Sequence, residues 1–184
     1  MALTKVIGSG LGAIPAISGA NLTGLTSGQL PVGSVLQVTY ATSPANTVTS
    51  ATSYATTAIK TNITPKFSTS KILIQVQVNG IYAIERTTAT GLAIYKGIEG
   101  STMSSLKEFD NVSGYTHGSD HGVYGSHIAY NFLMSDAIGN TNNNRFEIYF
   151  KRIGGSGQIY INNYAANLYT NSSITLLEVA VWQI

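Results

Sequence analysis

All three histidines of the chain fall in one polar stretch, residues 111 to 127. His117, Asp120 and His121 are close enough in sequence to offer imidazole and carboxylate ligands to a divalent metal, with His127 as a fourth ligand. The glycines between them favour turns over a rigid scaffold that would hold a coordination geometry. We therefore expect a solvated loop without a metal ion, and we expect no cofactor elsewhere in the chain.

The same stretch contains the residue types of a hydrolytic triad. Ser119, Asp120 and His121 follow one another directly, but neighbouring residues on a loop or strand do not generally converge on one point, and no Gly-x-Ser-x-Gly elbow accompanies them. Glycoside cleavage would need two paired carboxylates from only eight acidic residues, in a chain without repeats. We expect a protein that is not an enzyme.

Binding is the better role for this stretch. Its tyrosines supply rigid amphipathic rings beside adaptable polar groups, a mixture that recognition surfaces and sugar sites favour. The predicted receptor-binding residues are Asn111, Tyr115, His117, Asp120, His121 and Tyr124. The alternative is that the tyrosines pack on the domain itself.

The elements that must position these residues are expected to be strands. Charged residues make up 10% of the 184 residues, and Gly, Ser, Thr, Asn and Tyr supply most of the polarity, which suits turns and strand faces. A formal net charge of +2 is too small for a nucleic-acid surface, and no apolar run is long enough to insert into a membrane. The chain has no cysteine, so its stability must come from burial and association.

Two segments show the alternation of a strand with one buried face. In residues 71 to 79 the isoleucines and valines share one face, and in residues 145 to 152 the phenylalanines and Ile148 point inward while Glu147 points outward. Asn79-Gly80 reads as a turn before a further strand at residues 81 to 85. Several short strands with such turns predict an all-β fold, a jelly-roll-like antiparallel β-sandwich.

The last predicted strand, residues 173 to 184, is apolar on both faces. One face carries Ile174, Leu176, Ala180, Trp182 and Ile184, and the other carries Leu177, Val179 and Val181. Such a strand needs two covers, and a neighbouring subunit can supply the second. We predict a subunit interface at Leu177, Val179, Val181 and Trp182; the alternative is a central strand covered by the domain's own loops.

The N-terminal part differs in composition. Lys5 is the only charged residue before Lys60, and isolated apolar residues alternate with glycines. This pattern predicts an extended segment over residues 1 to 32 that orders against another protein, followed by a β-sandwich domain over residues 33 to 184; a disordered tail is the alternative. The predicted anchor residues are Leu11, Ile14, Ile17, Leu22, Leu25 and Leu30.

Four short segments are together similar to a known group of proteins. They cover residues 1 to 6, 31 to 38, 63 to 74 and 173 to 179, and they resemble small tail-fibre and head-fibre proteins of tailed bacteriophages. The resemblance implies a homotrimer whose N-terminal segment attaches to the particle and whose jelly-roll knob projects outward as a tail fibre that contacts the host.

The resemblance also implies the partners and the location. The N-terminal segment would bind another virion protein, either a tail adaptor or tube protein or the major capsid protein, and the knob would bind a host-surface glycan or protein. The protein would be assembled in the host cytoplasm and lie on the virion surface. The main alternative is a capsid decoration protein that stabilises the shell, and a free carbohydrate-binding lectin is a third class.

Overall fold

The computed structural model describes residues 30–83, 88–110, 126–164 and 168–181. In these ranges the chain forms strands and connecting loops, without a helix. The strands are β1 (Val35–Ser43), β2 (Thr47–Thr49), β3 (Ala55–Ile63), β4 (Lys71–Ala83), β5 (Ala89–Ile98), β6 (Ser104–Phe109), β7 (Ser126–Leu133), β8 (Asn144–Ile153), β9 (Ile159–Ile161), β10 (Asn163–Tyr164), β11 (Leu168–Tyr169) and β12 (Ser172–Val179).

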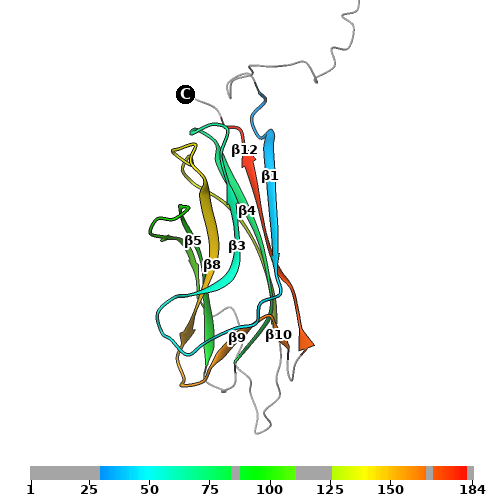
Figure 1. Cartoon of the computed structure of the whole chain (residues 1–184), viewed down its shortest axis with the longest axis vertical. Coiled ribbons are helices and arrows are strands. Elements are labelled where there is room, and N and C mark those ends of the chain that lie inside the picture. Colours follow the sequence, from blue (N-terminus) through cyan, green and yellow to red (C-terminus); the bar gives the residue numbers. More distant parts are fainter. Residues whose placement is uncertain (1–29, 84–87, 111–125, 165–167, 182–184) are drawn as a thin grey trace, which may run out of the picture.

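Two antiparallel sheets form the layers of a sandwich (Figure 1). One contains the order β1-β12-β4-β7, and the other has the order β3-β8-β5-β6. Each sheet therefore pairs strands from the beginning of the chain with strands from its end, which is the strand arrangement of a jelly roll. The predicted all-β antiparallel sandwich is confirmed, and the short strands β2 and β9 extend the first sheet beyond the end of β4.

The core lies between the two sheets and follows the predicted alternation. Ile72, Ile74 and Val78 of β4 are buried, and they belong to one cluster with Phe146 and Phe150 of β8. Each such side chain contributes roughly 1.5–3 kcal/mol when it leaves water. The inward faces of residues 71 to 79 and 145 to 152 therefore agree with the sequence prediction.

Strand β4 does not end at Asn79-Gly80, so the predicted turn is wrong. The strand continues to Ala83, and its pairing with β7 shifts register between Val78 and Ile81, as in a β-bulge. Gly80 has φ +58°, and a Cβ atom there would lie 2.6 Å from Thr170 Oγ1. The glycine thus permits a bulge inside one long strand instead of a turn between two short strands.

A buried carboxylate joins three distant segments. Glu178 lies on the inward face of β12, fully buried, although its neighbours on that face are apolar. The backbone amides of Lys66 and Phe67 donate hydrogen bonds of 2.9–3.1 Å to its carboxylate, and Gln37 Nε2 donates one of 2.7 Å. Gln37 Nε2 also donates to the Thr64 carbonyl at 2.7 Å. Three of the four segments that resemble phage fibre proteins therefore meet at Glu178.

Strand β12 is a central strand of its sheet and pairs with β1 on one side and β4 on the other. Within the described ranges, no helix is long and apolar enough to cross a membrane.

Candidate functional site

The sequence-predicted receptor residues Asn111, Tyr115, His117, Asp120, His121 and Tyr124 lie outside the described residues. So do the anchor residues Leu11, Ile14, Ile17, Leu22 and Leu25, while Leu30 is the first described residue and is half-buried. Of the predicted interface, Leu177, Val179 and Val181 are described and Trp182 is not.

The three described interface residues share the outward face of the first sheet. Leu177, Val179 and Val181 are half-buried there, while Ile174 and Leu176 point into the core. The two-sided apolar character of this strand is therefore real: one side is covered by the domain's own core, and the other side faces outward.

An apolar row crosses this outward face from one sheet edge to the other. Val38 of β1 pairs with Leu177 of β12, Leu177 pairs with Leu73 of β4, and Leu73 pairs with Leu133 of β7. The residues at the two ends are the exposed ones, with Val38 55% and Leu133 50% accessible. We call these four residues the apolar row.

More apolar side chains lie beside the apolar row on β1. A bulge between Val35 and Gln37 turns Val35 to the same side as Val38, opposite Val179, whereas simple alternation would have separated the two valines. Val35 and Tyr40 are exposed. The outward face is thus apolar at one end of the sheet apart from Lys71, which pairs with Val179.

The other end of this face is rich in amides and hydroxyls. A shallow depression there is lined by Gln75, Gln77, Asn131 and Thr175, with the small side chain of Ala129 among them. Its lining holds no ionisable side chain other than the Tyr130 phenol.

The outward face of the second sheet is different, because it carries a tyrosine cluster. Tyr95 of β5 stacks on Tyr149 of β8 with ring centroids 4.0 Å apart, and Tyr54, from the loop before β3, meets Tyr95 edge-on at 5.8 Å. All three rings are half-buried. Such contacts fix the rings relative to one another.

Charged groups surround these rings. Lys151 Nζ lies 4.3 Å above the Tyr54 ring, 3.8 Å from Glu108 Oε2 and 3.4 Å from Asp110 Oδ1. Gly91, opposite Lys151 on β5, leaves room for this side chain, since a Cβ atom there would lie 3.0 Å from Lys151 Cε. We call Tyr54, Tyr95, Tyr149, Lys151, Glu108 and Asp110 the tyrosine face.

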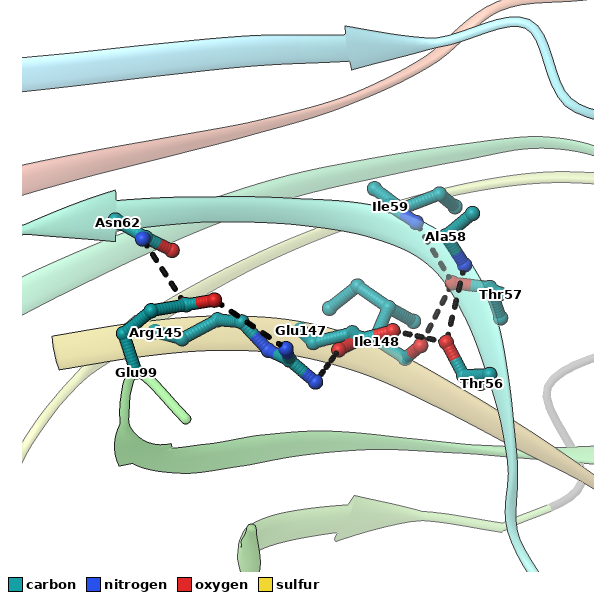
Figure 2. Close-up of polar contacts among 9 residues, drawn as sticks. All are labelled: Thr56, Thr57, Ala58, Ile59, Asn62, Glu99, Arg145, Glu147 and Ile148. Carbon is teal, nitrogen blue, oxygen red and sulfur yellow. Dashed lines mark hydrogen bonds and ion pairs between the residues drawn. The ribbon is translucent and has the colours of Figure 1, made fainter. Parts of the chain in front are cut away.

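Beside the tyrosine face lies a chain of polar contacts, drawn in Figure 2. Asn62 Nδ2 donates to Glu99 Oε2 at 3.0 Å, Glu99 Oε1 lies 3.7 Å from Arg145 Nη1, and Arg145 Nη2 lies 2.7 Å from Glu147 Oε2. Thr56 Oγ1 donates to Glu147 Oε1. The series connects β3, the end of β5 and β8.

Glu147 lies on the outward face of β8, as predicted. Its side chain is nevertheless buried, with 2% exposed. Glu147 Oε2 and Arg145 Nε are both buried, and neither atom makes a hydrogen bond. Arg145 Nη2 lies 2.7 Å from Glu147 Oε2, so the two side chains form an ion pair. Burial follows because Arg145 and Thr56 cover the carboxylate from β8 and β3.

A bulge in β3 places Thr56. The pairing of β3 with β8 shifts register between Thr56 and Lys60, and Ala58 has φ +62°, which L-residues other than glycine rarely adopt. Thr57 Oγ1 donates to the Ile148 carbonyl at 2.6 Å, and the Ala58 amide donates to Thr56 Oγ1 at 3.3 Å. Backbone in this region costs of order 1–3 kcal/mol, and such positions cluster at functional sites.

The surroundings raise the pKa of two of these tyrosines. Burial, followed by the charges of Glu108 and Asp110, raises the pKa of Tyr54. Burial and the Glu108 charge raise the pKa of Tyr95 as well. The Tyr54 hydroxyl lies 3.3 Å from Glu108 Oε2 and 3.4 Å from the Leu92 carbonyl oxygen, and these two acceptors share its single proton.

Across the described ranges, no group of three or more His, Cys, Asp or Glu side chains is placed to hold a metal ion. Of the predicted ligand set, His117, Asp120 and His121 lie outside those ranges, and His127 on β7 has its Nδ1 3.0 Å from Asn79 Oδ1.

Sequence reasoning missed the tyrosine face because its members come from separate elements. Tyr54, Tyr95 and Tyr149 are far apart in sequence and meet only through the register of β5 with β8 and the loop before β3. One signal was present: Tyr149 and Lys151 alternate with the buried Ile148 and Phe150, which placed both on the outward face.

Comparison with known proteins gives a distant likeness in fold. No protein-family model matches the chain, and no curated protein matches it. Among solved structures, that of infectious bursal disease virus Gx strain matches with a TM-score of 0.40 and 15% identity, and the VP2 subviral particle of the same virus with 0.42 and 12%. These matches cover 79% and 80% of this chain, which spans only 37% and 39% of the viral chains. A likeness this distant does not indicate function.

Proposed function

We propose that this chain is a structural protein of a bacteriophage particle. Three copies assemble through the outward face of the β1-β12-β4-β7 sheet and display the jelly-roll domain on the particle surface as the knob of a tail fibre. The observation that carries this proposal is the apolar row, because a soluble monomer gains nothing from aligned, half-exposed Val38 and Leu133 at two sheet edges.

The charge of this face favours a second copy of the same chain as its occupant. Among its outward positions on β1, β12, β7 and residues 71–79 of β4, Lys71 is the one Lys, Arg, Asp or Glu. Interface cores are depleted of charged residues, and a partner of matching character should be equally poor in charge. Another copy supplies such a surface with amides and hydroxyls at its border.

The distribution of the exposed residues favours a ring over a two-fold pair. A closed trimer needs a heterologous contact, in which one patch meets a different patch on the next subunit. Val35, Val38 and Tyr40 lie at the β1 edge, and Leu133 lies at the β7 edge. We propose that the β1 edge of one copy packs on the β7 edge of the next, which also covers strand edges that invite aggregation.

Assignment to a phage particle depends on the motif resemblance and is supported by Glu178. The hydrogen bonds from Gln37, Lys66 and Phe67 make three of the resembling segments one structural unit. The chain enters the domain beside its last described residues, since the Gly33 amide donates to the Ala180 carbonyl at 3.0 Å. Residues 1 to 32 are proposed to attach that end of the domain to another virion protein.

Sedimentation equilibrium of the full chain tests the assembly. We expect a species of three times the 19.4 kDa chain mass, and we expect Val38→Asp to dissociate it because a carboxylate enters the interface. Val48→Asp is the matched control, since Val48 on β2 is 50% exposed and β2 lies beyond the end of β4, away from the apolar row. A folded monomer or a dimer of the unaltered chain would contradict the proposal.

Location on the particle needs a second measurement. Quantitative mass spectrometry of purified particles should find this chain in far fewer copies than the major capsid protein if it belongs to the tail. A copy number comparable to that of the capsid protein would replace the tail fibre with the head-decoration alternative and leave the trimer intact.

A further inference from the structure

The tyrosine face remains free when copies assemble as proposed. It is the outward face of the β3-β8-β5-β6 sheet, whereas assembly uses the outward face of the other sheet, on the opposite side of the sandwich (Figure 1). Its rings and carboxylates therefore stay accessible to a ligand from outside the assembly.

We propose that the tyrosine face binds an uncharged saccharide. The faces of aromatic rings are electron-rich, and the C–H bonds on one side of a pyranose ring present weak positive charge to them. Tyr54, Tyr95 and Tyr149 form a contiguous group of half-buried rings on this sheet face. Tyr95 and Tyr149 turn one face each to the other, and Lys151 lies over Tyr54, so the other face of Tyr149 is the ring surface that we assign to the sugar.

Exposed carboxylates beside the rings provide hydrogen-bond acceptors for hydroxyl groups. Glu108 and Asp110 have side chains 48% and 57% exposed, and Lys151 lies between them within 3.8 Å and 3.4 Å. An ionised carboxylate accepts hydrogen bonds at both oxygens, and bonds to charged groups are stronger than neutral ones. Neighbouring hydroxyls of one sugar ring can thus donate to both acids.

The surface is arranged before any ligand arrives. The Tyr95–Tyr149 stack, the Tyr54 hydrogen bond to Glu108 and the position of Lys151 over Gly91 restrict these side chains. Binding therefore costs little side-chain entropy, which matters for a ligand with few contacts.

The charge of the surface selects against acidic sugars. Beside the rings, the exposed carboxylates of Glu108 and Asp110 share one cation, Lys151, which leaves the ring surface locally negative. A sialylated or uronic-acid ligand would bring further negative charge. An uncharged saccharide meets no such repulsion.

Glycan-array binding by the intact full chain, followed by saturation-transfer NMR with methyl glycosides of glucose, galactose and N-acetylglucosamine, tests this inference. We expect binding of uncharged glycans, no binding of sialyllactose, and a loss of about tenfold or more in affinity for Tyr149→Ala, which is about 1.4 kcal/mol. Tyr160→Ala is the matched control, because Tyr160 stacks on Tyr82 at 4.8 Å outside the tyrosine face and should leave binding unchanged.

Glu108→Gln is the second variant. The Glu108 side chain is 48% exposed, so we expect the variant to fold. It should weaken binding several-fold with an unchanged circular dichroism spectrum. Absence of uncharged-glycan binding overturns the inference. So does binding unaffected by both variants, or binding of oligolysine alone, which would identify the face as a docking surface for a basic peptide.

That the saccharide belongs to a host-surface glycan rests on the proposed function, but the binding itself does not. A trimer that binds no glycan contradicts only this inference. If the unaltered chain is a monomer that binds uncharged glycans, and its Tyr149→Ala variant does not bind them, only the proposed assembly is contradicted.

Discussion

At the residue scale, Glu178 shows how a buried charge is made acceptable. A carboxylate out of water is costly unless hydrogen bonds replace its hydration. Here the donors are the Lys66 and Phe67 amides and the Gln37 side chain, from a loop and a strand that precede Glu178 by more than a hundred residues. The residue thus acts as a clamp on the loop between β3 and β4.

Replacing Glu178 with Gln should destabilise the domain strongly. The amide NH₂ group would face backbone N–H donors, and we expect a loss of about 2–4 kcal/mol in the free energy of unfolding. Urea denaturation at fixed protein concentration measures it. Glu108→Gln is the control, since that exposed carboxylate should change stability by less than about 1 kcal/mol. Equal effects of the two variants would show that the clamp is unimportant.

The raised pKa of Tyr54 leads to a prediction about stability at alkaline pH. Because its pKa is raised in the folded state, the fold holds the phenol proton more tightly than the unfolded chain does. Its contribution to stability is complete below the ordinary tyrosine pKa of about 10 and is lost as the pH rises above that value. Tyr54→Phe should therefore lose less stability between neutral and strongly alkaline pH than the unaltered chain.

The alkaline measurement needs a control for other titrating groups. The pKa of Lys96 is lowered by desolvation, so its deprotonation at high pH acts with the opposite sign, equally in both proteins. The difference between the two pH profiles is therefore the quantity to compare, because groups common to both proteins cancel in it. A parallel pH profile for Tyr54→Phe would refute the assigned role.

At the scale of elements, bulges decide which side chains face outward. The bulge in β1 brings Val35 to the side of Val38, the bulge in β3 places Thr56 over Glu147, and the bulge at Gly80 keeps β4 continuous. A one-residue shift of register exchanges the two faces of a strand. Both surfaces proposed to function therefore depend on irregularities in otherwise regular strands.

Gly80→Ala should damage β4 more than an equivalent change elsewhere. The new methyl group would meet Thr170 Oγ1 at 2.6 Å and the Asn163 amide nitrogen at 2.8 Å, in addition to the strain of a positive φ. We expect a loss of about 2–4 kcal/mol, measured by chemical denaturation.

Gly139→Ala separates steric contact from backbone strain. Gly139 has φ +81°, but no atom lies within 4 Å of the place that an alanine methyl group would take, so only about 1 kcal/mol of strain is expected. If both variants lost the same stability, the close approach at Gly80 would not matter.

At the scale of the whole molecule, the two sheets of the sandwich expose unlike surfaces. One is apolar and nearly uncharged along Val38, Leu177, Leu73 and Leu133, and the other carries rings and ion pairs. A fibre knob needs both kinds of surface, one to hold its subunits together and one to meet a partner. The proposed assembly and the proposed saccharide site therefore occupy opposite sides without competing.

If copies stabilise one another, thermal stability must depend on concentration. The melting temperature of the unaltered chain should rise with protein concentration, because association favours the folded state. Val38→Asp should melt at a lower temperature that no longer changes with dilution. Scanning calorimetry over a wide concentration range measures both. A concentration-independent transition in the unaltered chain would argue for an independent monomeric domain.

The sequence by itself determined the all-β class, the inward faces of residues 71–79 and 145–152, and the two-sided apolar last strand. These follow from alternation between near neighbours, which a strand converts directly into faces. Only the tertiary structure decided that Glu147 is buried, that Val35 joins Val38, and that Tyr54, Tyr95 and Tyr149 meet. Those outcomes depend on cross-strand register and bulges between segments far apart in the chain, and no local pattern encodes them.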